Sequence, residues 1–163
     1  MADMGIHALD TARLLLGDPQ PVSVYARIGT YYGNFDVDDT GVILVNWDNG
    51  TTSYIESGWW QPHADGPQAA TQLYGVNGFA SLFPTRIETP NADRNGLDVL
   101  DPGLPFPRQE QCPQSMYDDQ MAYFCNCIQT NSLPNPGGLE GWVNMRVIDA
   151  AYQSARTGKE VDL

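Results

Sequence analysis

The fold of this chain is decided by the stretch Thr40-Gly-Val-Ile-Leu-Val-Asn-Trp-Asp-Asn-Gly50-Thr-Thr-Ser-Tyr-Ile-Glu-Ser-Gly-Trp-Trp60. Residues 40–48 and 51–60 are rich in β-branched and aromatic side chains, which is typical of strands. The dipeptide Asn49-Gly50 between them is the strongest hairpin-turn signal in the chain. The stretch therefore predicts an antiparallel pair of strands.

Strand signals continue on both sides of this hairpin. The further strands that we expect are residues 21–32, 70–75, 78–83 and 85–88, with a short terminal strand in 159–163. Val76-Asn-Gly78 predicts a second hairpin turn between two of them. Residues 61–68 are expected to form a polar loop. Residues 90–113 are rich in Pro, Gly and Asp, so we expect a long excursion with little regular structure.

Three segments have apolar residues at helical spacing. We expect helices in residues 2–16, 114–129 and 138–157. A helix, a run of hairpins and two more helices predict a single α+β domain over residues 1–163. Its sheet is expected to be open and largely antiparallel, with helices packed on one face. The other face can contact water or a second subunit. The aromatic residues of the strands either fill the core or form such an interface.

The composition excludes several classes of protein. The chain has 163 residues, 42% of them hydrophobic, which is enough for one domain with a core. Twenty acidic residues against 8 basic ones give a net charge of −12, which argues against nucleic acid and anionic membranes as partners. No apolar run is long enough to span a membrane. Cys112, Cys125 and Cys127 do not form a disulfide framework and indicate small buried residues in a reducing, cytoplasmic setting.

The expected N-terminal helix carries a candidate acid–base group. Asp3, His7 and Asp10 lie at i, i+4 and i+7, which places them on one face of a helix. Carboxylates beside an imidazole orient it and raise its basicity, so the group is suited to proton transfer. His63, in the expected polar loop, is a second candidate for contact with a ligand. An ordinary surface cluster is the alternative. A zinc site of Asp3, His7 and His63 lacks a second ligand pair, so no metal is expected.

A second polar cluster, Asp36, Asp38 and Asp39, precedes the strand expected at residues 40–48. Oxygen ligands of this kind can bind calcium. Their spacing is not that of an EF-hand loop, and we therefore expect a solvated turn instead.

Five stretches follow one another in a characteristic order. They are Asp3-Met-Gly-Ile-His7-Ala-Leu-Asp10 with Leu-Leu-Gly-Asp-Pro19, Asp36-Val-Asp-Asp-Thr40 before Asn49-Gly50, Leu73-Tyr-Gly75 before Asn77-Gly78, Pro134-Asn-Pro-Gly-Gly138 before Val147-Ile-Asp-Ala-Ala-Tyr-Gln-Ser154, and Thr157-Gly-Lys-Glu-Val161. Together they resemble the substrate domain of the glucose–fructose oxidoreductase / inositol dehydrogenase / MocA-type oxidoreductases. The resemblance covers nearly the whole chain.

That resemblance implies a two-domain enzyme that oxidises or reduces a sugar, a polyol or a related hydroxyl compound. A Rossmann domain would hold NAD or NADP. The α+β domain, similar to the C-terminal domain of dihydrodipicolinate reductase, would supply substrate contacts and the oligomer interface. His7 is implied as the acid/base and Asp3 as its assistant, while Asp10 and His63 are candidates for substrate contact.

The chain also departs from the family pattern. It contains no G-x-G-x-x-G after an opening strand, which dinucleotide binding requires, and no Glu-Lys-Pro motif with its catalytic lysine. We therefore expect the C-terminal portion of such an enzyme, as a truncation, a proteolytic remnant or the product of a gene without its front half. Its expected partners are the missing Rossmann domain and a second copy, in a homodimer or tetramer built through the sheet face. The isolated chain is expected to bind no cofactor and to be inactive. The alternative is a non-catalytic, dimeric module that binds carbohydrate or protein.

Overall fold

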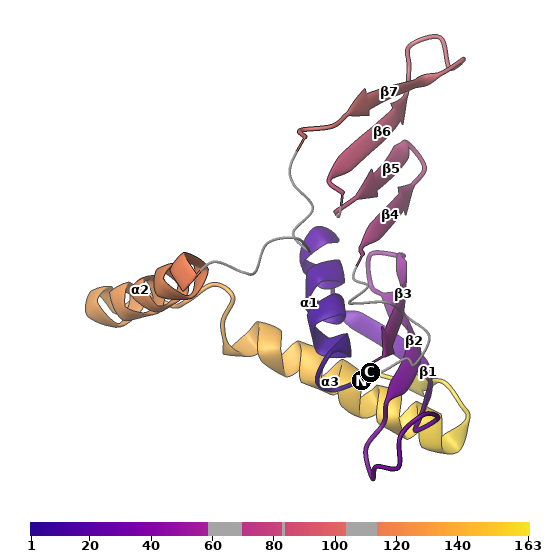
Figure 1. Cartoon of the computed structure of the whole chain (residues 1–163), viewed down its shortest axis with the longest axis vertical. Coiled ribbons are helices and arrows are strands. Elements are labelled where there is room, and N and C mark those ends of the chain that lie inside the picture. Colours follow the sequence, from indigo (N-terminus) through magenta and orange to yellow (C-terminus); the bar gives the residue numbers. More distant parts are fainter. Residues whose placement is uncertain (59–69, 83, 104–113) are drawn as a thin grey trace. The chain divides into compact units, whose positions relative to one another are not determined.

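The computed structural model describes residues 1–58, 70–82, 84–103 and 114–163. In chain order the elements are α1 (Gly5–Leu15), β1 (Pro21–Gly29), β2 (Thr40–Trp47), β3 (Thr52–Gly58), β4 (Gln72–Gly75), β5 (Gly78–Ser81), β6 (Arg86–Pro90), β7 (Leu97–Leu100), α2 (Gln114–Thr130), α3 (Gly138–Thr157) and β8 (Val161–Asp162). Figure 1 follows them along the chain. They belong to two compact units, Met1–Ala64 with Asn135–Leu163, and Asp65–Pro134. The expected α+β class is confirmed.

The first unit is built on sheet A, whose strands follow the order β3-β2-β1-β8. All of its neighbouring strands are antiparallel. The predicted hairpin is present, with Gly50 at φ +80° in the turn and Ile43 opposite Ile55 in the ladder. A positive φ is unstrained for glycine, which explains this residue in the turn. The terminal strand that we expected pairs with β1 through Val161 and Asp162.

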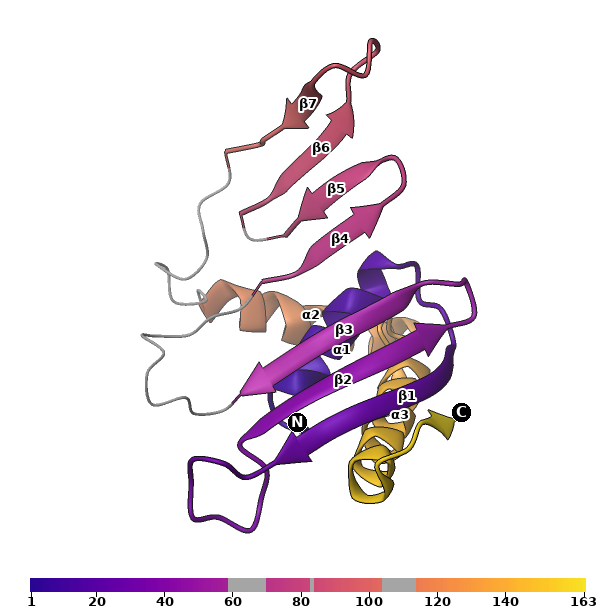
Figure 2. The same cartoon turned by 90° about the vertical axis from the view of Figure 1, so that its right-hand side faces the viewer.

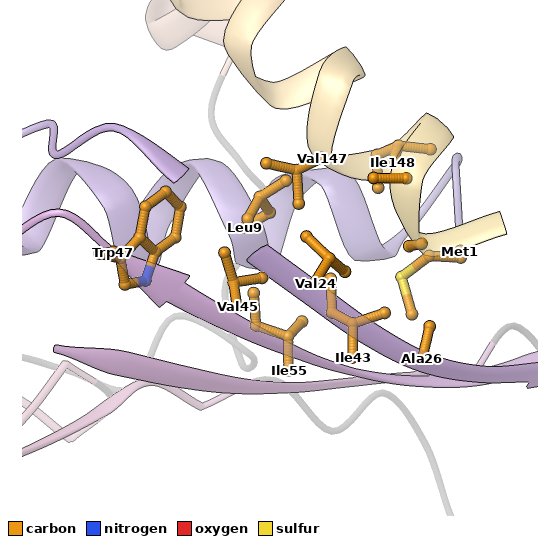
Figure 3. Packing of buried hydrophobic residues seen from close by; sticks show 12 residues of the cluster. Met1, Leu9, Val24, Ala26, Ile43, Val45, Trp47, Ile55, Val147 and Ile148 are labelled. Atoms are coloured by element: carbon orange, nitrogen blue, oxygen red, sulfur yellow. The ribbon is translucent and has the colours of Figure 1, made fainter. Parts of the chain in front are cut away.

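Helices α1 and α3 cover one face of sheet A, and Figure 2 shows the opposite face of this sheet turned to the viewer without a helix of the same unit over it. Alternate residues of the strands point towards the helices and are buried with them. Figure 3 shows this cluster, which consists of Met1, Leu9, Val24, Ala26, Ile43, Val45, Trp47, Ile55, Val147, Ile148, Ala150 and Ala151. The core of the first unit therefore lies between sheet A and its two helices.

The second unit contains sheet B, a meander in the order β4-β5-β6-β7, and helix α2. The predicted hairpin across Val76-Asn-Gly78 joins β4 and β5. Strand β7, however, lies within residues 90–113, where we expected little regular structure. The reason is a turn in which Asn91 and Asn95 hydrogen-bond to each other, followed by the β-favouring run from Leu97 to Leu100.

The helix predictions need two corrections. Helix α1 begins at Gly5 rather than at residue 2, so Asp3 lies in the turn that precedes it. In α2, Cys127 is buried as predicted, but the prediction that Cys125 is buried is wrong, because residues two apart on a helix point in different directions. Cys112 lies outside the described residues. In the described ranges of the chain, no helix is long and apolar enough to cross a bilayer.

Candidate functional site

The first turn of α1 and the turn before it carry the predicted acid–base residues. Asp3, His7 and Asp10 are all exposed. Because the helix begins at Gly5, only His7 and Asp10 share a regular helical face. The described contacts include no hydrogen bond or ion pair between Asp3 and His7. Both side chains are therefore presented to the surroundings of the domain, where a ligand or another domain can reach them.

Helix α1 is held close to the sheet at this point. A Cβ on Gly5 would lie 3.3 Å from the Cβ of Ser57, which is buried on β3. The absence of a side chain at position 5 lets the helix backbone approach the strand. One turn further, Leu9 is completely buried in the core. The two contacts fix which face of α1 is turned away from sheet A.

The far end of α1 is fixed by a buried arginine. Arg13 is 3% exposed, and its Nε donates a hydrogen bond of 3.1 Å to the carbonyl of Pro19. Its Nη1 also lies 3.7 Å from a carboxylate oxygen of Asp18. A cation near the last turn compensates the partial negative charge of the helix C-terminus. The arginine thus anchors the connection between α1 and β1.

Asp10 has a partner within the fold. The Nδ2 of Asn144, on α3, donates a hydrogen bond of 2.6 Å to Oδ1 of Asp10, and Asn144 itself is 3% exposed. Sequence reasoning missed Asn144. The available signal was a polar residue inside the helical stripe that also contains Val143 and Val147.

His63 lies outside the described residues, so the structure leaves its predicted role untested. The chain before it can be followed to Gly58, next to Ser57, and Ser57 packs against the first turn of α1. Among the described residues, no three His, Cys, Asp or Glu side chains are grouped so as to hold a metal ion.

The acidic cluster between β1 and β2 is not a solvated turn throughout. Asp39 is 1% exposed, and its carboxylate accepts backbone N–H groups from Tyr31, Tyr32 and Gly33 at 2.8–3.1 Å. Burial raises the pKa of Asp39, but the three backbone donors outweigh it and lower the pKa to about 2. The expectation failed here because three adjacent N–H groups replace water around this carboxylate.

Asp38 of the same cluster is also engaged. Its Oδ1 accepts a hydrogen bond of 2.5 Å from the hydroxyl of Tyr152 on α3, and its Oδ2 contacts the amino group of Met1. Burial opposes ionisation of Asp38, but these donors outweigh it, so its pKa lies below its ordinary value. Asp38 and Tyr152 line a shallow hollow of about 420 Å³ between the loop and α3.

The described strands do not offer a dinucleotide site. Binding of a dinucleotide in α/β folds uses parallel strands and the N-terminus of the helix that connects them. Each paired strand in the described parts of both sheets is antiparallel to its neighbour. The described strands therefore contain no parallel pair of the kind that this mode of dinucleotide binding uses.

Comparison with known proteins adds a family and several relatives. Residues 1–81 match the family model of the GFO/IDH/MocA C-terminal domain. The chain is 29% identical to the D-xylose 1-dehydrogenase (NADP(+)) 2 of Haloferax volcanii, over 99% of the chain and 47% of that protein. It is 27% identical to the D-glucoside 3-dehydrogenase of Escherichia coli, over 100% of the chain and 48% of that protein. The chain thus spans about half the length of the curated relatives it matches.

A solved structure agrees with these relatives. The aldose-aldose oxidoreductase of Caulobacter crescentus, complexed with glycerol, superposes with a TM-score of 0.69 and 28% sequence identity. The match covers 99% of this chain and 46% of that one. The similarity therefore extends over the whole chain and is confined to about half of the larger protein.

Proposed function

Because the chain belongs to the GFO/IDH/MocA oxidoreductase family, we propose that it is the substrate and oligomerisation domain of an NAD(P)-dependent dehydrogenase. The substrate class is a sugar, a polyol or a related hydroxyl compound, as the names of the relatives suggest. The observation that carries the proposal is the exposed pair Asp3 and His7 at the start of a helix that is otherwise held firmly in the fold.

In this proposal, His7 handles the proton of the reaction. Oxidation of a carbinol requires that its hydroxyl lose a proton, and a neutral imidazole can accept that proton. Asp3 assists His7, and its negative charge stabilises the imidazolium that forms. Asp10 and His63 are candidates for contacts with the substrate hydroxyl groups. The nicotinamide, which takes the hydride, would be held by a part of the enzyme other than the described chain, so the chain alone is inactive.

Titration of the purified 163-residue chain with a panel of aldoses and polyols, followed by NMR, tests this function. We expect binding that is lost in Asp3→Asn and His7→Ala. The matched control is Asp93→Asn, which changes an exposed carboxylate of the second unit. If the chain binds sugars equally well in all variants, it is a binding module that does not use these residues. If the purified chain alone reduces NAD or NADP with a polyol, the assignment of the cofactor to another part is wrong.

We further propose that the face of sheet A opposite α1 and α3 forms the oligomer interface with a second copy. Tyr25, Leu44 and Tyr54 lie side by side in the ladder and form an apolar row. In the adjacent row, Arg27 and Glu56 lie on either side of the same strand, so two copies related by a two-fold axis can pair their opposite charges. An apolar row with a charged rim is the composition expected of an interface core.

Sedimentation velocity tests this interface. We expect the wild-type chain to sediment as a dimer or larger, and Tyr54→Lys as a monomer, because a lysine would be buried without a partner in the interface. Tyr74→Lys is the control, since Tyr74 is a comparably exposed tyrosine on sheet B. A Tyr54→Lys chain of unchanged mass would place the interface elsewhere.

A further inference from the structure

Helix α3 makes hydrogen bonds at two points to the segment that carries Asp3 and His7. At one point, the Nδ2 of Asn144 donates a hydrogen bond of 2.6 Å to Asp10. At the other point, the hydroxyl of Tyr152 accepts the backbone N–H of Ala2 at 3.3 Å. The same hydroxyl donates to Asp38 at 2.5 Å. Both contacts link residues that are more than 100 positions apart in the sequence.

The two points lie on either side of the acid–base residues. Ala2 and Asp10 are eight residues apart, and so are Asn144 and Tyr152, with the order reversed. The two contacts therefore follow one another in opposite orders along the two segments. Asp3 and His7 both lie between the two attachment points.

Apolar packing fixes which face of α1 is turned away from sheet A, but it limits the exact rotation and height of the helix less closely than hydrogen bonds do. Between the two points, Leu9 contacts the core cluster that contains Val147 and Ile148, as Figure 3 shows. Apolar burial is non-directional, so on its own it tolerates small rotations and shifts of this 11-residue helix. Hydrogen bonds have narrow limits of distance and angle, so a pair of them sets both the rotation and the height of the helix.

The surroundings of Asn144 indicate that this residue positions Asp10 rather than adding to the stability of the fold. Its Oδ1 is buried and has no hydrogen-bond partner. An unsatisfied buried amide oxygen is destabilising, which offsets much of the gain from the bond to Asp10. An apolar residue of similar volume would fill the same space without that cost. What such a residue could not do is hold the carboxylate of Asp10.

The Tyr152 contact has its own support. Burial raises the pKa of Asp38, but the donors on it, the amino group of Met1 and the hydroxyl of Tyr152, outweigh burial and lower this pKa. Both donors favour the ionised carboxylate, which is the acceptor for the Tyr152 hydroxyl. Because the hydroxyl hydrogen of Tyr152 points to Asp38, a lone pair of the same oxygen is left to accept the N–H of Ala2. Asp38 thus orients Tyr152, and Tyr152 fixes the backbone directly before Asp3.

We propose that Asn144 and Tyr152 are positioning residues that hold Asp3 and His7 in a fixed orientation for the substrate. The inference rests on the proposed function of Asp3 and His7. The two residues do not touch the substrate themselves. They act through Asp10 and through the backbone at Ala2, one on each side of the pair.

Two variants separate this role from general stability. Asn144→Leu keeps the side-chain volume and removes the bond to Asp10. Tyr152→Phe keeps the ring and removes only the hydroxyl. The matched control is Ser154→Ala, on the same helix. Ser154 is fully buried, and its hydroxyl accepts the N–H of Ala26 and donates to the carbonyl of Lys159, so its contacts reach β1 and not α1.

The readout is NMR on the full 163-residue chain, and it needs neither substrate nor cofactor. The chain has two histidines, so a His63→Gln background assigns the imidazole signals of His7. In both test variants we expect these signals to shift and the order parameters of residues 3–7 to fall from about 0.85 towards 0.6 or lower. Ser154→Ala should leave both unchanged.

Either of two results would overturn the inference. One is unchanged His7 signals and order parameters in both test variants. The other is an equal change in Ser154→Ala. If Asn144→Leu fails to fold, Tyr152→Phe alone decides, since it removes a single atom at the edge of the core. A chain that binds no sugar refutes the proposed function but leaves this NMR result standing, so the two failures are distinguishable.

Discussion

The two sheets of this protein have the same number of strands and the same antiparallel pairing, yet among the described residues a buried core lies against only one of them. In sheet A, every second residue of β2 and β3 is buried beneath α1 and α3. In sheet B, the described residues of all four strands are exposed or half-buried. The pairing of strands therefore depends on local pattern and turns, while the core depends on the helices that cover the sheet.

This difference decides where a site can be built. Catalytic groups need a rigid support, and rigidity comes from packed and hydrogen-bonded surroundings. Helix α1 has sheet A on one side and polar bonds to α3 on another. The predicted acid–base pair lies on this helix and on the turn before it, and sheet B offers no equivalent support within its described residues.

The largest difference in stability between the two sheets is expected when one isoleucine in each of them is replaced. Ile43 in β2 is fully buried, whereas Ile87 in β6 is 44% exposed. We expect Ile43→Ala to lower the free energy of unfolding by about 2–5 kcal/mol, because it leaves a cavity in the core. Ile87→Ala should cost less than about 1 kcal/mol, since little apolar surface is lost. Urea unfolding of both variants gives the two free energies. Equal losses of unfolding free energy would show that Ile87 is also packed in a core.

A smaller effect is expected from two serines. Ser154 joins α3 to β1 through the N–H of Ala26, and its loss leaves that buried donor unpaired. We expect Ser154→Ala to cost about 1–3 kcal/mol. Ser81 in sheet B donates to the carbonyl of Pro84 at an exposed position. Ser81→Ala should change the unfolding free energy by less than about 0.5 kcal/mol. The same urea experiment measures both, and a cost at Ser81 as large as that at Ser154 would contradict the comparison.

Much of the architecture could be predicted from the sequence because its turn signals are local. Asn49-Gly50 and Val76-Asn-Gly78 each predicted a hairpin, and both are present. Strand β7 was missed because the Pro, Gly and Asp around it outweighed the short run from Leu97 to Leu100. The order of elements likewise predicted helices on one face of a sheet.

The polar contacts between distant segments could not be predicted in this way. Tyr152 and Asp38 are 114 positions apart, and their hydrogen bond depends on how α3 crosses sheet A. The sequence predicted a solvated turn at Asp39. That prediction failed because the burial of Asp39 depends on the path of the β1–β2 loop, which the residues of the cluster do not indicate. A single sequence carries no signal for such pairings, since periodicity identifies an apolar face but not the partner of one polar residue on it.

The β1–β2 loop belongs to the first unit and provides a test in acid. Folding lowers the pKa of Asp39 from 3.8 to about 2, so the ionised form stabilises the native state fully above about pH 4. That contribution is lost as the pH falls towards 2. We therefore expect the stability difference between the wild type and Asp39→Asn to shrink between pH 4 and pH 2 in urea unfolding. A difference that stays constant from pH 4 to pH 2 would contradict this account of Asp39.

The smallest expected effect on stability is at the site itself. His7 is exposed, so truncation removes no core contact, and we expect His7→Ala to change the unfolding free energy by less than about 0.5 kcal/mol. Leu9→Ala, two residues further along the same helix, should cost about 2–5 kcal/mol because Leu9 is completely buried. Urea unfolding of both variants, paired with the sugar titration, separates the two roles of α1. A stable His7→Ala chain that binds no sugar would mean that α1 packs against the core with one face and contacts the substrate with the other. A strongly destabilised His7→Ala chain would instead show that His7 is a structural residue.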